Sequence, residues 1–124
     1  MSAKTVSLIF SSYTVGMNES NLTFIFDNRG TRKLLAKNPQ LRSRMIETIT
    51  RQAENDFFKC KLASRRKWQG ISLLECRVND PSVGALRVAF GCKDQTIYVV
   101  YATTTILKKD FSQELDSFLK DGSK

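Results

Sequence analysis

Three consecutive β-strands are predicted between residues 71 and 107, and this run constrains the fold more than any other feature of the chain. The strands are expected at Ile71–Val78, Ala85–Cys92 and Thr96–Leu107. Leu74, Cys76 and Val78 occupy every second position, and the next strand alternates in the same way. This period of two buries one face of a sheet and leaves the other polar. Short, turn-rich connections indicate an antiparallel meander.

The third strand differs from the other two. Before Thr103 it is apolar on both alternations. That pattern is typical of a strand that is central in its sheet or well covered.

The rest of the chain supplies a hairpin and three helices. Residues 6–26 are rich in β-branched and aromatic types on both sides of a turn-rich segment, which indicates a first hairpin. Two helices are expected between residues 31 and 58, a short one at Thr31–Lys37 and an amphipathic one from about Pro39 to Phe58. A last amphipathic helix is expected at residues 111–119.

The predicted order is therefore β-β-α-α-β-β-β-α. It indicates an α+β fold, an antiparallel β-sheet with helices packed on one face, which leaves the other face open. At 124 residues the chain is expected to form one domain, residues 1–124.

The chain is strongly basic. Twenty Lys and Arg against twelve Asp and Glu give a net charge of +8. Between Lys59 and Arg77 there are six cations and one acidic residue, Glu75. Such an excess attracts polyanions, so a nucleic-acid contact is predicted, although a run of charge is also compatible with a solvated loop.

Composition also predicts that several features are absent, among them disulfides, a metal site and a membrane span. The three cysteines are far apart and not in metal-ligand spacing, so we expect a reducing, cytoplasmic location, no disulfide framework and no metal. No apolar run is long enough for a membrane span, and the apolar stretch near the N-terminus is too short for a signal peptide. No motif indicates a small-molecule cofactor.

Arg77 and Arg87 lie at polar positions of neighbouring predicted strands. Two guanidinium groups on one open face would make an anion site, since each matches two phosphate oxygens and stays charged. Alternatively, each arginine is a surface charge paired with a carboxylate such as Glu75 or with a cross-strand partner. Glu75 has two interpretations, a catalytic base or a carboxylate that orients Arg77, and the second is expected.

Four sequence motifs, taken in order, resemble the RelE/ParE superfamily of toxin–antitoxin toxins, nearest to its HigB-like, phage-associated branch. They are Lys67-Trp68-Gln69-Gly70, Leu73-Leu74-Glu75-Cys76-Arg77-Val78, Ala85-Leu86-Arg87-Val88-Ala89-Phe90, and the strand ending in Leu107-Lys108-Lys109-Asp110. The resemblance in element order spans about residues 29–119.

The resemblance implies a RelE-like fold and a ribonuclease that cuts messenger RNA on the ribosome and is held inactive by a cognate antitoxin. Carried over position by position, it implies that Arg77 and Arg87 grip the scissile phosphate. It implies further RNA or phosphate contacts for Arg66, Lys67, Lys108 and Lys109. An alternative within the same fold is a non-catalytic protein, either a DNA gyrase inhibitor or an inactive, phage-related nucleic-acid-binding protein.

Cleavage of RNA without a metal needs a proton acceptor and a proton donor. The chain has no histidine, so the proton shuttle must use another side chain, with Lys67, Lys108, Tyr98 and Tyr101 as candidates. We therefore predict a catalytic set of Lys67, Arg77, Arg87 and Lys108.

Five further residues are predicted to contact RNA: Arg65, Arg66, Trp68, Tyr101 and Lys109. Trp68 has two interpretations, because its ring can stack on a base or cover the edge of the core.

Overall fold

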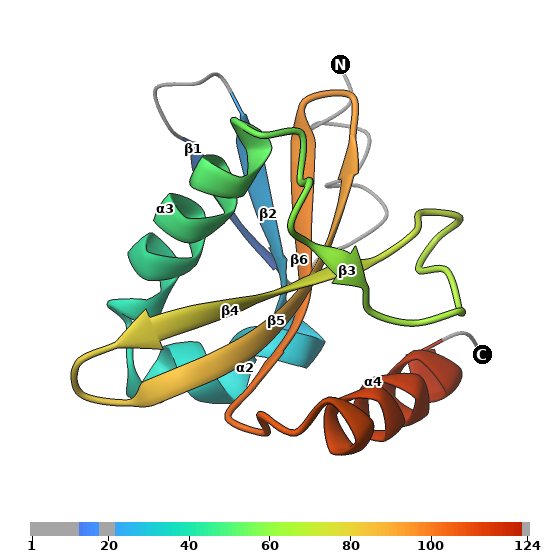
Figure 1. The fold of residues 1–124 in the computed structure, drawn as a ribbon. Coiled ribbons are helices and arrows are strands. Elements are labelled where there is room, and N and C mark those ends of the chain that lie inside the picture. The colour runs from blue at the N-terminus through green and yellow to red at the C-terminus, as the bar shows by residue number, and fades with distance from the viewer. Residues whose placement is uncertain (1–12, 18–21, 123–124) are drawn as a thin grey trace.

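The computed structural model describes residues 13–17 and 22–122 (Figure 1). The elements in chain order are β1 (Tyr13–Met17), β2 (Thr23–Asp27), α2 (Asn28–Lys37), α3 (Leu41–Ala53), β3 (Lys61–Leu62), β4 (Leu74–Asp80), β5 (Gly84–Lys93), β6 (Thr96–Thr103) and α4 (Lys108–Gly122). The fold is α+β, as predicted. None of the helices in these two ranges is long and apolar enough to cross a membrane.

The strands of the described residues form one sheet in the order β1-β2-β6-β5-β4-β3. The predicted meander is confirmed, because β4, β5 and β6 pair antiparallel in sequence order. The prediction of an antiparallel sheet is wrong at one place, since β2 pairs parallel with β6 and the sheet is mixed. The predicted element order also lacks β3, whose two residues are too few to show a period.

The first hairpin is present in part. Strands β1 and β2 pair antiparallel, with Tyr13 opposite Asp27 and Met17 opposite Thr23. The remaining residues of the predicted hairpin, 6–12 and 18–21, lie outside the described residues.

Several element ends differ from the predicted ones. Helix α2 begins three residues early because the Asp27 carboxylate caps it, accepting a hydrogen bond from the Arg29 backbone N–H at 3.0 Å. Helix α3 ends at Ala53 rather than Phe58, since Asp56 and Phe57 adopt φ angles of 54° and 59°. Strand β6 ends at Thr103, and α4 is longer than predicted at both ends.

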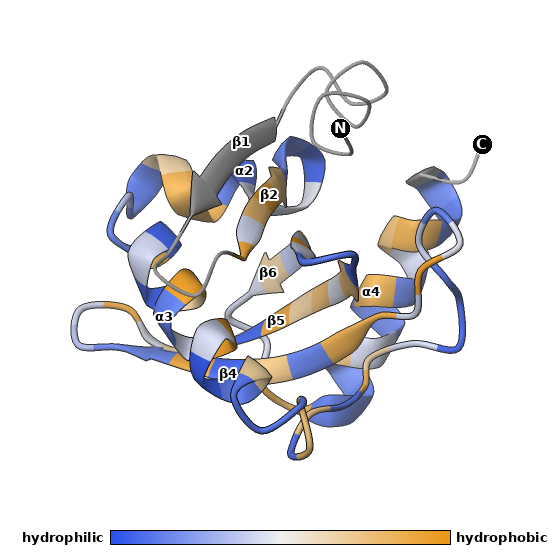
Figure 2. Ribbon diagram, turned by 90° about the horizontal axis from the view of Figure 1, so that it is seen from above, coloured by the Kyte–Doolittle hydropathy of each residue, from blue (hydrophilic) through white to orange (hydrophobic). Residues whose placement is uncertain are grey.

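Helices cover both faces of the sheet, so the prediction of helices on one face is wrong. Helices α2 and α3 pack on one side through a cluster that includes Leu35, Met45 and Val88. Helix α4 packs on the opposite side, where Phe111 and Leu115 lie in a second cluster. Figure 2, seen from above, shows α3 and α4 on either side of the central strands.

Strand β6 is apolar at successive positions because helices cover both faces of the sheet. Ile97 and Val99 belong to the α2/α3 cluster, whereas Tyr98 and Val100 belong to the α4 cluster. A strand with helices on both sides needs apolar residues at every position.

Gly30 in α2 allows the helix to approach β6 closely. A Cβ atom at this position would lie 1.8 Å from the Val100 carbonyl oxygen. Because that oxygen belongs to the backbone of a central strand, it cannot move aside at low cost. The close packing of α2 against β6 therefore depends on this glycine.

We expect Gly30→Ala to lower the free energy of unfolding by at least about 2 kcal/mol, because the added methyl group has no space. Urea unfolding monitored by circular dichroism measures the change. Lys37→Ala, at an exposed position of the same helix, is the control. Equal stability of the two variants would contradict the close contact.

Asp80 holds the turn between β4 and β5. Its Oδ2 atom accepts hydrogen bonds from the backbone N–H groups of Ser82 and Val83, at 3.0 and 3.1 Å, and from the Ser82 hydroxyl at 2.6 Å. Arg44 of α3 forms an ion pair with the same carboxylate at 3.3 Å. The Ser82 hydroxyl contributes most to lowering the pKa of Asp80, which falls from 3.8 to about 2.

Because its pKa is lowered in the folded protein, the Asp80 carboxylate stabilises the fold above pH 3.8 and loses that contribution as the pH falls toward 2. Asp80→Asn should therefore have a lower melting temperature than the wild type at pH 7, and the difference should narrow below pH 3.8. Thermal melts across this range measure it. Asp94→Asn, in the turn after β5, controls for the loss of one charge, and a gap that stays constant with pH would contradict the role of Asp80.

Candidate nucleic-acid interface

Arg77 and Arg87 lie directly opposite each other on β4 and β5. Directly paired residues of an antiparallel ladder point to the same face, with Cα atoms about 5 Å apart. Thr103 of β6 lies opposite Arg87 on the other side. This is the face that α4 covers in part. Like charges at such positions destabilise a sheet, so the pair needs compensation.

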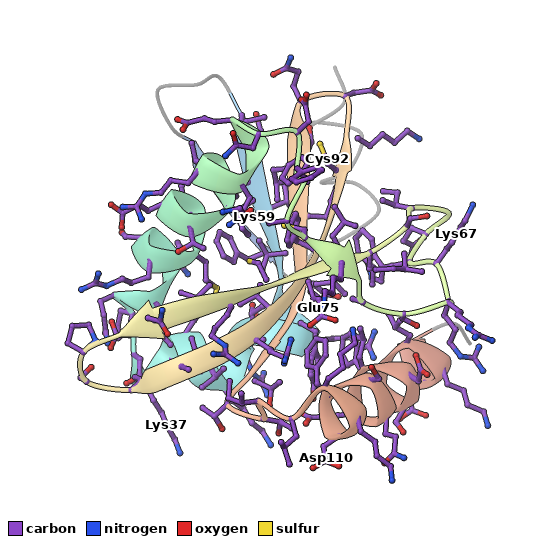
Figure 3. All side chains as sticks on the ribbon, viewed as in Figure 1. Lys37, Lys59, Lys67, Glu75, Cys92 and Asp110 are labelled. Carbon is purple, nitrogen blue, oxygen red and sulfur yellow. The ribbon has the colours of Figure 1, made fainter. Side chains whose placement is uncertain are left out.

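Glu75 supplies the compensation. Its side chain is only 3% exposed and forms ion pairs with Arg87 through Oε1 and with Lys108 of α4 through Oε2. Lys61 of β3 lies directly opposite Glu75 in the sheet. We call these residues the Glu75 cluster: Lys61, Glu75, Arg77, Arg87 and Lys108. Figure 3 shows Glu75 between the sheet and α4.

The cluster holds four cations and one carboxylate. Ion pairing with Glu75 alone accounts for the burial of this carboxylate and for the presence of its two direct partners, Arg87 and Lys108. The other two cations, Arg77 and Lys61, are exposed and have no ion-pair partner within residues 13–17 and 22–122. The cluster therefore presents an uncompensated positive charge to solvent.

Arg87 is fixed in place by three contacts. Besides Glu75, its Nε–H group donates to the Ile106 carbonyl at 2.5 Å, and its guanidinium carbon lies 5.8 Å from the centre of the Phe111 ring. Its side chain is 18% exposed. The expected pairing of Glu75 with Arg77 is wrong, because the carboxylate binds Arg87 instead. Arg77 is thus the more open of the two arginines.

Opposing effects act on the pKa of Lys108. Burial and the charge of Lys61 lower its pKa, whereas its ion pair with Glu75 favours the charged form. Its Nζ atom also donates to the Leu62 carbonyl at 3.2 Å. Lys108 and Lys109 are the first two residues of α4, where the helix dipole disfavours cations. Glu75 offsets this cost for Lys108, and Lys109 is exposed.

Three cations of the predicted basic segment lie apart from the cluster. Arg65, Arg66 and Lys67 are exposed in the loop between β3 and β4. The Ser64 hydroxyl anchors this loop to α4 by a 2.5 Å hydrogen bond to Asp116. In Figure 3, Lys67 projects from the loop, away from Glu75. The structure therefore does not bring Lys67 together with Arg77, Arg87 and Lys108.

Trp68 is a core residue. It is 9% exposed, and its ring centre lies 5.4 Å from that of Tyr98. Gln69 and Gly70, both with positive φ, form the tight turn that folds Trp68 back onto Ile71. The ring is therefore not open to a base, and the core-edge interpretation is the correct one.

Tyr101 is half-buried under α4, where its hydroxyl donates to the Glu114 carboxylate. Burial, together with Glu114, raises the pKa of Tyr101. The phenol therefore stays protonated at neutral pH and cannot serve as a general base.

Sequence reasoning missed Lys61 and the true partners of Glu75. Lys61 belongs to the basic run, but its strand is only two residues long. Its position opposite Glu75 depends on pairing with β4, which no local pattern specifies. The signal available was the single acidic residue in a cationic stretch, since a buried carboxylate needs cations.

Within the described ranges, no three His, Cys, Asp or Glu side chains gather in a way that would hold a metal ion. Comparison of the chain with family models, curated proteins and solved structures finds no match. The site must therefore be interpreted from its own geometry.

We expect Glu75→Gln to lower the free energy of unfolding by about 3 kcal/mol, since it leaves Arg87 and Lys108 without a countercharge. Arg77→Gln should change it by less than about 0.5 kcal/mol, because Arg77 is exposed and the change removes a like-charge contact. Urea unfolding at one salt concentration compares them. Equal effects would show that Glu75 does not neutralise the cluster.

Proposed function

We propose that this protein is the toxin of a toxin–antitoxin system, resembling the RelE/ParE superfamily and its HigB-like branch. In this proposal it is a metal-independent endoribonuclease that cuts messenger RNA on the ribosome in the cytoplasm. The observation that carries the proposal is the Arg77–Arg87 pair, two cations directly opposite each other on adjacent strands. Glu75 compensates the charge of Arg87, so the open guanidinium of Arg77 beside it stays available to an anion such as a phosphate.

The Glu75 cluster suits phosphoryl chemistry on RNA. Arg77 is open and would bind the two non-bridging oxygens of the scissile phosphate, whose charge grows in the transition state. Arg87 is held by Glu75 and Ile106, so its guanidinium is preorganised beside Arg77. Lys108, with its lowered pKa, would protonate the leaving 5′-oxygen. The attacking group is the 2′-hydroxyl of the RNA itself, which would form the new bond to phosphorus as the bond to the 5′-oxygen breaks and would lose its proton to solvent water.

The same charge supports a proteinaceous inhibitor as partner. An acidic or amphipathic segment of a cognate antitoxin would pair with the exposed cations Lys61 and Arg77 and so exclude RNA. Long-range attraction between opposite charges would also speed this association.

One observation favours a second, non-catalytic function. The raised pKa of Tyr101 and the ion pairs of Glu75 leave no evident base beside Arg77 among the described residues. A protein that binds nucleic acid without cutting it, or that inhibits DNA gyrase, needs only the cations. General acid–base help contributes about 10²–10⁴-fold, so its absence would separate these functions clearly.

Inducible expression in a bacterial host tests the proposal. We expect growth arrest and cuts in cellular messenger RNA, mapped by primer extension. Arg77→Gln should reduce cutting at least about 100-fold, as for loss of one transition-state donor. Arg51→Gln, an exposed arginine on α3, is the matched control and should remain toxic.

Each other outcome has a defined meaning. DNA damage with intact messenger RNA would support gyrase inhibition, and normal growth would reject a toxin. Arg87→Gln is less informative than Arg77→Gln, because losing the Glu75 partner also lowers stability. Toxicity of Arg77→Gln equal to that of the wild type would overturn the role of the arginine pair.

A further inference from the structure

A pocket of about 630 Å³ lies between α2, the end of β6 and α4. Its place follows from the sheet. Because β2 and β6 are parallel neighbours, the segments that follow them leave the sheet at the same end. Helix α2 follows β2, and α4 follows β6 after a short connection (Figure 1). The volume is within the range of small-molecule sites.

Three cations line the α2 side of this pocket: Arg29, Arg32 and Lys33. All three are exposed, and none has an ion-pair partner among the residues that the structure describes. Arg29 is held over the Phe118 ring, with its guanidinium carbon 4.5 Å from the ring centre. Stacking occupies a face of the guanidinium and leaves its N–H edge available to an anion.

The α4 side of the pocket carries a carboxylate, Glu114. Burial alone would raise the pKa of Glu114, but hydrogen bonds from the hydroxyls of Tyr101, Thr105 and Thr103 lower it overall. Glu114 is therefore ionised at neutral pH, and it forms no ion pair with the three cations of the same pocket.

Unpaired charges of both signs in one pocket define the ligand. The cations suit an anionic group, and the carboxylate, which already accepts from the hydroxyls of Tyr101, Thr105 and Thr103, has acceptor capacity left for one further donor such as a sugar hydroxyl. A carboxylate that accepts from ribose hydroxyls is a recurrent feature of nucleotide sites. A ribonucleotide carries both a phosphate and hydroxyl donors, and DNA lacks the 2′-hydroxyl.

One residue of the pocket is a neighbour of the arginine pair. Thr103 lines the pocket and lies directly opposite Arg87 in the sheet. An RNA chain with its phosphate at Arg77 and Arg87 would therefore reach the pocket with an adjacent nucleotide.

We propose that this pocket binds one ribonucleotide of the RNA chain next to the scissile phosphate, with its phosphate on Arg32 and Lys33 and its 2′-hydroxyl on Glu114. The inference rests on the proposed function insofar as the ligand is RNA. It adds a specific reason for the protein to prefer RNA over DNA.

The test measures binding of fluorescent single-stranded RNA, and of DNA of the same sequence, by anisotropy. Arg32→Ala/Lys33→Ala should weaken binding of both at least about tenfold and lower the salt slope by about 1–2, because phosphate contacts carry no sugar preference. The control is Lys37→Ala/Lys59→Ala, which removes the same charge from exposed sites outside the pocket. Equal weakening by both pairs would overturn the cation part of the proposal.

Glu114→Gln should lower the ratio of RNA to DNA affinity severalfold while DNA binding is unchanged or stronger, since it replaces one of the two acceptor oxygens with an NH2 donor and removes a repelling charge. Asp121→Asn, on the exposed end of the same helix, should leave the ratio unchanged. Thermal melts confirm that each variant is folded. A wild-type ratio in Glu114→Gln would overturn the ribose contact.

Calorimetry with adenosine 5′-monophosphate tests whether the pocket binds a nucleotide within an RNA chain or a free nucleotide. We expect binding far weaker than that of RNA, and comparable affinity would overturn the assignment to an RNA chain. The two proposals fail separately. Absent cleavage with intact RNA preference rejects the nuclease alone, whereas cleavage that persists in Arg32→Ala/Lys33→Ala with unchanged affinity rejects the pocket alone.

Discussion

The buried Glu75 carboxylate is the interaction on which the candidate site depends. It joins three elements at once, because it lies on β4 and binds Arg87 of β5 and Lys108 of α4. Without it, the opposed arginines and the two lysines around them would repel one another at close range. With it, one arginine is fixed and the other stays free. A single negative charge thereby makes a positive site compatible with a stable sheet.

The parallel pairing of β2 with β6 has a comparable effect on the architecture. It directs α2 and α4 to the same end of the sheet, and Gly30 lets α2 approach the β6 backbone. The basic first turns of α2 thus line the pocket between α2, the end of β6 and α4. Positive charge from both halves of the chain converges at one end of the molecule.

Sequence periodicity was sufficient to place Arg77 and Arg87 on one face, because a period of two assigns each residue a side of its strand. It could not show that they are direct neighbours, since register depends on pairing between distant segments. The same reason explains the missed partner of Glu75 and the missed strand at Lys61. The face on which α4 packs was also beyond local patterns, although the apolar residues of β6 on both alternations already indicated two covered faces. Trp68 was ambiguous because a ring beside cations suits either a core or a base.

Helix α4 connects features that were described separately above. Three polar residues of this helix make contacts elsewhere. Lys108 forms an ion pair with Glu75, and Glu114 accepts a hydrogen bond from Tyr101. Asp116 accepts one from Ser64 and so anchors the basic loop. Its apolar residues Phe111 and Leu115 also cover the sheet. A shift of this one helix would alter the charge balance of the cluster, widen the neighbouring pocket and release the loop together. The Glu75 cluster, the pocket and the loop between β3 and β4 are therefore coupled through α4, and a change at one of them that moves the helix should also affect the other two.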